Sequence, residues 1–167
     1  VETCEHTPAF VHTGPFANIS YGNSSVIADH VALKLCDYVV TEAGFGSDIG
    51  LEKFFHIKAR QGALEPAGVV LVTTVRGLKY QSGDFSASGR ILPTKLFQKD
   101  IRSLKKGLPH LLFHMNNALR FDKPLFVLIN RFDTDTQEEI DLIKSFAMEN
   151  GASIAESCDG FLCGGEG

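Results

Sequence analysis

The chain has 167 residues, of which 44% are hydrophobic and 22% are charged, a composition that excludes a fibre, a disordered tail and a disulfide-stapled miniprotein. Its 16 Lys and Arg against 20 Asp and Glu leave a formal net charge of -4, so no overall positive field favours nucleic acid as a partner. The longest strictly apolar run, residues 125–129, is far shorter than the roughly 20 residues of a membrane-spanning helix. We therefore expect a soluble protein with neither a nucleic-acid nor a membrane partner.

The four cysteines form no C-x-x-C pair, which gives a zinc site little support. A chain of this size can build its core without disulfide bonds, so reduced thiols and a cytoplasmic location are the better interpretation. No H-E-x-x-H motif is present, and we assign no residue to a metal. The cysteines are Cys4, Cys36, Cys158 and Cys163.

Short apolar runs alternate with longer amphipathic stretches along the chain. In order, the pattern predicts an extended run over 9–12, a helix over 24–35, a buried strand over 38–41, a helix over 49–60, a strand over 68–75, a helix over 97–119, a strand over 124–129, a helix over 136–150 and a weak strand over 152–155. Gly107 and Pro109 predict a break or kink in the long helix. A loop over 81–94 precedes a basic helical segment over 95–120.

Strands that alternate with helices in this way predict an α/β fold: a mainly parallel sheet with helices on both faces, in one compact unit spanning 1–167. Ligands of such sheets bind beyond the carboxyl ends of the strands. The chemically unusual side chains of this chain do follow the predicted strands. They include His12, Glu42, Asp48, Arg76, Lys79, Asn130, Phe132, Asp135 and Phe161.

The turn TEAGFGSD, residues 41–48, combines a carboxylate, glycines that let a backbone approach a ligand, and an acid at a helix start. A tight strand-to-helix turn capped by Asp48 is the purely structural alternative. No G-x-x-x-x-G-K-[ST] sequence occurs in the chain, so a bound nucleotide would need its phosphate loop elsewhere.

Arg76 and Lys79 follow a strong strand and could hold a phosphate or a carboxylate, or could be two solvated bases in a loop. Asn130 and Asp133 match the base-reading N-x-x-D of small GTPases, a weak signal without a phosphate loop. Phe132, an aromatic in a polar turn, either tucks under the turn or stacks on a planar ligand.

The stretch from Arg90 to Lys123 has eight bases against two acids, leaving about -10 on the remainder of the chain. A solvated helix face explains this charge, and a dock for an acidic substrate tail or partner is the alternative. The six histidines are scattered, with no sign of nucleophilic catalysis.

Several strings together resemble the formate–tetrahydrofolate ligases, including that domain of the trifunctional one-carbon enzymes. They are TPAFVH (7–12), GPFANI (14–19), NSS (23–25), VVTEAGFG (39–46), EKFF (52–55), VTTVRGLK (72–79), the turn holding Asn130, Phe132 and Asp135, and GGEG (164–167). The resemblance covers nearly the whole chain, and EAGFG and V-x-T-V-R-x-L-K are its most specific parts.

The resemblance implies an ATP-dependent ligase of one-carbon metabolism: formate attacks the γ-phosphate to give formyl phosphate, and N10 of tetrahydrofolate then takes the formyl group. It also implies Mg²⁺, a monovalent cation, a homotetramer, and a P-loop-NTPase-like core whose phosphate loop lies before the part matched here. Such chemistry depends on positioning and charge stabilisation more than on a nucleophile.

Residue roles follow from the same resemblance. The pterin ring is expected between Phe132 and Phe161, the latter standing where the family normally has Trp, and Asn130 and Asp135 join them as substrate-binding candidates. The catalytic candidates are Arg76, Lys79 and Glu42. The nucleotide-side candidates are Gly44, Gly46, Asp48 and Phe54.

The chain departs from the family pattern at several positions. Tyr21 replaces a histidine, Gly77 an alanine and Cys163 a frequent lysine, and Tyr80, Gln81 and Ser82 replace M-H-G before Gly83. Altered substrate affinity, or a diverged non-catalytic binding or scaffold relative, is the alternative that these departures leave open. We expect the isolated chain, as a central part of the ligase without its phosphate loop, to be inactive.

Overall fold

The computed structural model describes residues 1–11, 23–86 and 92–167, so His12, Tyr21 and part of the loop at 81–94 lie outside the described residues. The chain divides into two compact units, Val1–Pro66 and Ala67–Gly167, where the sequence predicts one. The three strands all belong to the second unit. Each unit is therefore described by itself.

The first unit is helical. Helix α1 (Val26–Leu35) begins at Ser25, whose Oγ accepts a hydrogen bond from the backbone N–H of Ala28, and it confirms the helix predicted over 24–35. The helix predicted over 49–60 is also present, as the π-helical turns η1 (Ser47–Leu51) and η2 (Phe54–Lys58) followed by α2 (Ala59–Gly62). It ends at Ala63, which has a left-handed backbone with φ of 47°.

The strand predicted over 38–41 is wrong. These residues take no regular secondary structure, and the Tyr38 and Val40 side chains are 90% and 94% exposed. The preference of Tyr and Val for strands reflects packing on a pleated, half-buried surface, and no strand among the described residues pairs with 38–41. Residues 9–11 of the predicted extended run also form no strand.

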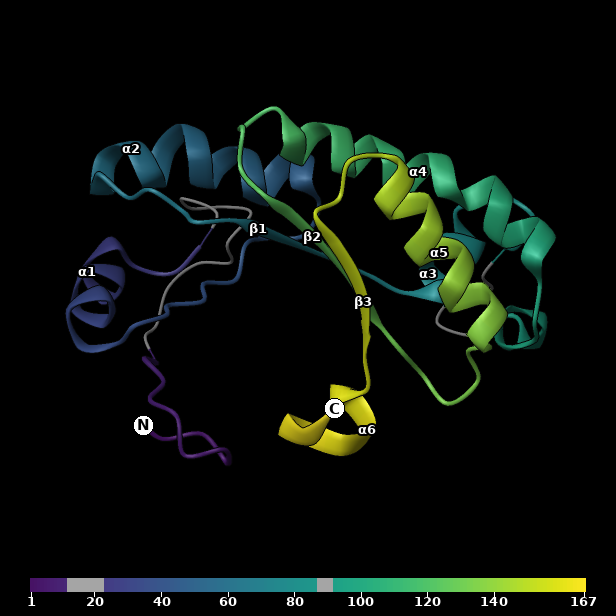
Figure 1. Ribbon diagram of the computed structural model, residues 1–167, viewed down its shortest axis with the longest axis horizontal. Coiled ribbons are helices and arrows are strands. Elements are labelled where there is room, and N and C mark those ends of the chain that lie inside the picture. The colour runs from purple at the N-terminus through teal and green to yellow at the C-terminus, as the bar shows by residue number, and fades with distance from the viewer. Residues whose placement is uncertain (12–22, 87–91) are drawn as a thin grey trace. The chain divides into compact units, whose positions relative to one another are not determined.

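The second unit is built on a parallel sheet in the order β1 (Val69–Thr73), β2 (Leu125–Asn130) and β3 (Ile154–Cys158) (Figure 1). Leu71 pairs with Val127, which in turn pairs with Ala155. The first two strands confirm the prediction, whereas β3 lies two to three residues later than predicted. Parallel pairing places the carboxyl ends of all three strands at one edge of the sheet.

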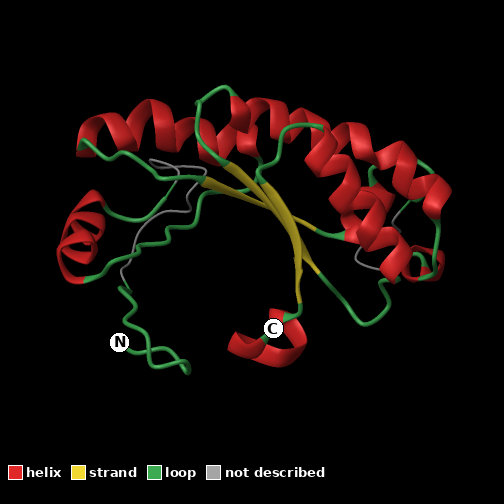
Figure 2. Ribbon diagram, in the orientation of Figure 1, coloured by secondary structure: helices red, strands yellow, loops and turns green. Residues whose placement is uncertain are grey.

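Helices α4 (Ile101–Leu119) and α5 (Gln137–Glu149) lie on the same side of this sheet (Figure 2). The core between them contains Val127, Ile129, Leu111, Met115, Ile140 and Ile143. On the opposite face Val70, Val72 and Ile154 are more than half exposed. Among the described residues of this unit, helices thus cover one face rather than the two expected.

Helix α4 runs without interruption through Gly107 and Pro109, so of the predicted break or kink the break is wrong and the kink stays a prediction. A Cβ atom at Gly107 would lie 1.8 Å from the backbone oxygen of Leu78 in helix α3 (Val75–Tyr80). Gly107 therefore allows two helices to touch. The apolar stripe buried on both sides of Pro109, including Leu104, Leu108 and Leu111, outweighs the hydrogen bond that proline removes.

Three short helices complete the unit: η3 (Thr94–Phe97), α6 (Gly160–Cys163) and η4 (Gly164–Glu166). Helix α5 begins with a capping box in which Thr136 and Glu139 exchange hydrogen bonds. Over the described ranges 1–11, 23–86 and 92–167, no helix has the length and apolar character needed to cross a membrane.

Candidate functional site

The carboxyl edge of the sheet gathers the residues that follow its three strands. Arg76 lies on α3, directly after β1; Phe132 lies in the turn after β2; and Phe161 lies on α6, after β3. Loops at this edge of a parallel sheet are the usual location of ligand sites. The structure thus brings together three of the residues singled out in the sequence.

Arg76 and three aromatic rings form a stack. The Arg76 guanidinium carbon lies 5.1 Å from the centre of the Phe97 ring and 3.5 Å from that of the Phe132 ring. The centres of the Phe132 and Phe161 rings are 5.1 Å apart, at an interplanar angle of 56°. At 3.5 Å the guanidinium covers one face of Phe132, so a planar ligand can stack only on the other face.

Phe97 was not a site candidate, because in the sequence it looked like one more apolar residue of the predicted helix over 97–119. Only the folded arrangement reveals its contact with Arg76. The Nε atom of Arg76 is buried and has no hydrogen-bond partner among the described residues.

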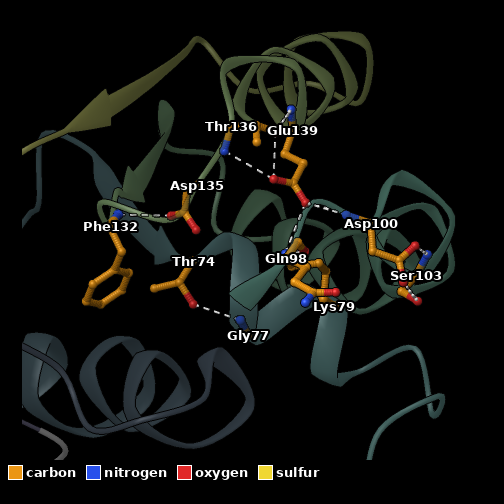
Figure 3. Close-up of polar contacts among 10 residues, drawn as sticks. All are labelled: Thr74, Gly77, Lys79, Gln98, Asp100, Ser103, Phe132, Asp135, Thr136 and Glu139. Carbon is orange, nitrogen blue, oxygen red and sulfur yellow. Dashed lines mark hydrogen bonds and ion pairs between the residues drawn. The ribbon is translucent and has the colours of Figure 1, made fainter. Parts of the chain in front are cut away.

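Asp135 stabilises the turn that carries Phe132. Its Oδ2 accepts a hydrogen bond of 2.9 Å from the Phe132 backbone N–H, and its own N–H donates to the Phe132 carbonyl at 3.0 Å (Figure 3). Burial raises the pKa of this carboxyl above its ordinary value, although the Phe132 N–H and the nearby charges of Arg76 and Lys79 oppose the rise. Asp135 is therefore a buried acid that shapes the Phe132 turn.

Lys79 is not a solvated base. Its side chain is 1% exposed, and its ammonium lies 3.0 Å from Oε1 of Glu139 and 2.9 Å from the carbonyl oxygen of Gln98 (Figure 3). The loop expected around Arg76 and Lys79 is the helix α3, capped by the Thr74 hydroxyl. In this arrangement the Lys79 ammonium contacts protein groups rather than the open edge of the sheet.

The remaining substrate-binding candidate, Asn130, is the last residue of β2 and is partly buried. The next residue, Arg131, forms an ion pair of 3.6 Å with Asp159, which precedes α6. This pair connects the turn after β2 to the segment that carries Phe161.

The other sequence candidates lie in the first unit. The exposed Glu42 accepts a hydrogen bond at its backbone oxygen from the Asn23 side chain. Gly46 has φ of 82°, and a Cβ atom at Gly50 would lie 2.0 Å from the Gly44 oxygen, so the turn is tightly closed. Asp48 is exposed near the start of η1, matching its predicted position.

Phe54, the last nucleotide-side candidate, is buried and packs edge-on against Phe55 with ring centres 5.2 Å apart. It is a core residue in this structure. Sequence reasoning also missed the buried ion pair between Lys58 and Asp29, whose charged atoms are 2.6 Å apart. Lys and Asp are so rarely buried that no local pattern indicates such a pair.

Two of the departures from the family pattern have visible structural settings. Gly77 lies next to the cap of α3, where a Cβ atom would be 2.7 Å from the Thr74 hydroxyl. Cys163 is an exposed free thiol. Throughout the described part of the chain, no three His, Cys, Asp or Glu side chains come together as a metal-binding group.

These observations define an α/β protein in which Arg76, Phe132 and Phe161 come together at the carboxyl edge of a parallel sheet. The family model for formate–tetrahydrofolate ligase matches residues 1–167. The chain is 52% identical to a formate–tetrahydrofolate ligase of Aeromonas hydrophila and 47% identical to that of Yersinia enterocolitica, in each case over the whole chain and 29% of the relative. It is 48% identical to the cytoplasmic C-1-tetrahydrofolate synthase of Homo sapiens, over the whole chain and 18% of that protein.

The chain belongs to the formate–tetrahydrofolate ligase family. It spans less than a third of the length of these curated relatives.

Proposed function

We propose that this chain contributes the folate side of an ATP-dependent ligase, which joins formate to tetrahydrofolate through formyl phosphate and yields 10-formyltetrahydrofolate. The observation that carries the proposal is the pair of rings, Phe132 and Phe161, at the carboxyl edge of the sheet. A pterin is a flat, polar heterocycle, and two aromatic side chains at a sheet edge are suited to hold one by stacking.

The ring geometry sets a condition on binding. A heterocycle between two parallel rings needs about 3.5 Å on each side, or about 7 Å between the ring centres. The present separation is 5.1 Å, so Phe161 has to move outward by about 2 Å. Phe161 is 69% exposed on a four-residue helix with no buried residue, so little packing opposes this movement.

Arg76 is the cation at this stack, and we propose that it stabilises negative charge on the substrates while supporting Phe132 from behind. Asn130 and Asp135 would complete the folate side, Glu42 is a further catalytic candidate, and Gly44, Gly46 and Asp48 would serve the nucleotide side. In place of its expected catalytic role, we assign Lys79 a positioning role, which is argued below.

ATP, Mg²⁺ and a monovalent cation belong to the proposed reaction as the family performs it. The described residues offer no three-ligand group for a metal, so we assign no step of this chain to Mg²⁺.

We further propose a P-loop-NTPase-like core, a homotetramer and a cytoplasmic location for the complete protein. The 167-residue chain alone should not turn over, because it carries no phosphate loop.

Tetrahydrofolate titration of the protein that carries residues 1–167 tests the proposal. Phe132→Ala and Phe161→Ala should each weaken binding about tenfold, because each removes one stacking partner worth roughly 0.5–1.5 kcal/mol beyond its buried area. Phe113→Ala is the matched control, since Phe113 is an exposed phenylalanine on α4. Unchanged affinity in both site variants would rule out the stacking site.

A further inference from the structure

Glu139 is a fully buried carboxylate at the start of α5 that accepts four hydrogen bonds. Its Oε1 accepts from the Lys79 ammonium and from the Asp100 backbone N–H, both at 3.0 Å. Its Oε2 accepts from the Thr136 backbone N–H at 3.1 Å and from the Thr136 hydroxyl at 2.7 Å. Figure 3 shows these contacts converging on one side chain.

The partners of Glu139 come from three separate segments: helix α3, the residues before α4, and the turn before α5. Each segment also carries a member of the stack. Arg76 lies three residues before Lys79, Phe97 directly precedes Gln98, and Phe132 lies four residues before Thr136. Since the Lys79 ammonium also donates to the Gln98 carbonyl, the buried ion pair is bonded to all three segments.

We propose that Glu139, together with Lys79, is a positioning residue for the stacking site. The buried pair fixes the three segments that carry Arg76, Phe97 and Phe132, and it thereby holds the Arg76 guanidinium against the two rings. The inference rests on the proposed folate function only for the identity of the ligand. The bonds of the two side chains go to each other and to the Gln98, Asp100 and Thr136 segments, so both act through the segments that they join.

The energetics of buried charges favour a geometric role. Desolvation of an ion pair largely cancels its attraction, so well-packed apolar residues could provide similar stability. What an apolar pair cannot provide is a set of directional bonds that fixes three backbones in register. Burial alone would raise the pKa of Glu139, but hydrogen bonds from Asp100, Thr136 and Lys79 outweigh it and hold the pKa below its ordinary value.

The test uses a tryptophan reporter in the protein that carries residues 1–167; these residues contain no tryptophan, and any tryptophan elsewhere in that protein is first replaced by phenylalanine. Phe132→Trp places the only indole in the stack and keeps an aromatic face there. In this background, Glu139→Gln is compared with Glu138→Gln, a matched control on the same helix whose carboxylate is 63% exposed and paired with Lys99. The double variant Lys79→Met, Glu139→Gln removes both buried charges together and so avoids leaving one unpaired.

Two readouts separate positioning from ligand identity. Without any ligand, acrylamide quenching of Trp fluorescence should rise about twofold in Glu139→Gln and in the double variant, because the half-buried ring becomes mobile. Tetrahydrofolate affinity should fall by between about tenfold and a hundredfold, as expected for a site displaced by about an ångström. Glu138→Gln should change neither quantity.

Each outcome of this experiment either supports the positioning role or overturns it. The proposal is supported if the double variant folds, its introduced tryptophan is quenched more strongly by acrylamide, and it binds folate more weakly. This holds even if Glu139→Gln alone fails to fold. A folded double variant with the quenching and affinity of the reporter protein overturns it, and so does a double variant that does not fold, since the pair would then act through stability. If quenching rises but the protein that carries residues 1–167 binds no folate even with Phe132 intact, the proposed function fails while the positioning role stands.

Discussion

The guanidinium carbon of Arg76 lies 3.5 Å from the centre of the Phe132 ring, close enough to cover one of its faces. The opposite face is the one available to a ligand, and the cation behind it draws electron density from the ring. Arg76, which the sequence suggested as a ligand for phosphate or carboxylate, thus also covers the back of the Phe132 ring. Binding an anion requires its charge, whereas covering the ring requires its flat guanidinium, so a substitution that keeps only the charge can separate the two roles.

Arg76→Lys should weaken tetrahydrofolate binding several-fold and lower the free energy of unfolding by about 0.5–1 kcal/mol, because an ammonium keeps the charge but loses the flat face that stacks on Phe132. Urea denaturation and a folate titration measure the two effects. Arg102→Lys, on the exposed surface of α4, is the control and should be neutral. Full folate affinity in Arg76→Lys would show that charge alone matters at this position.

Phe161→Trp should strengthen tetrahydrofolate binding, because the larger indole covers more of the heterocycle. The expected gain is several-fold, from a contribution of about 0.5–1.5 kcal/mol. Quenching of the single introduced tryptophan by folate reports binding directly. Weaker binding in this variant would mean that the pocket is built around the smaller ring.

Gly107→Ala should destabilise the protein by about 1–3 kcal/mol, because its Cβ atom would lie 1.8 Å from the Leu78 oxygen. If Gly107 were only a helix breaker, alanine would instead stabilise the helix by about 1 kcal/mol. Pro109→Ala, two residues later on the exposed side of α4, should stabilise the protein, since it restores a backbone donor. Chemical denaturation of both variants gives the signs, and a stabilising Gly107→Ala contradicts the close packing of α3 and α4.

Acidification should destabilise the second unit through Glu139 and Asp100. Both groups have a pKa below the ordinary value when folded: for Asp100 mainly because of hydrogen bonds from Ser103, and for Glu139 because hydrogen bonds from Asp100, Thr136 and Lys79 outweigh the opposing effect of burial. Their stabilisation is therefore complete above the ordinary carboxyl values of about 4 and is lost as pH falls through the lower folded values.

Asp135 has the opposite effect on the pH dependence of stability. Because its pKa is raised, its protonation partly offsets the stability that is lost through Glu139 and Asp100 as the pH falls. Urea denaturation across this pH range should show a shallower acid dependence in Glu139→Gln than in Glu138→Gln. Parallel curves for the two variants would contradict the role of Glu139 in acid stability.

Local patterns predicted the elements that depend on nearest neighbours along the chain. The apolar β-branched runs became β1 and β2, and the amphipathic stretch after Thr136 became α5. The strand predicted over 38–41 failed because strand-forming residues need a neighbouring strand to pair with, and sequence pattern does not reveal one. Helix α3 was missed because its six residues are too short for an apolar period to show.

The candidate site was predicted in part. Phe132, Phe161 and Arg76 came from their place after strands and from family strings, and the structure brings them together. Phe97 and Glu139 carried no such signal. Glu139 contacts Lys79 across 60 positions of sequence. The T-x-x-E spacing of Thr136 and Glu139 is a capping-box pattern, a signal of its local role that the sequence analysis did not use.

The central claim is that Phe132 and Phe161 hold the pterin ring, and nuclear magnetic resonance of the folate complex tests it most directly. With the phenylalanine rings isotopically labelled, we predict magnetisation transfer from pterin protons to the rings of both Phe132 and Phe161, and ring-current shifts in both. Phe113 should show neither effect. Transfer from the pterin to other rings, with the Phe132 and Phe161 signals unmoved, would contradict the account.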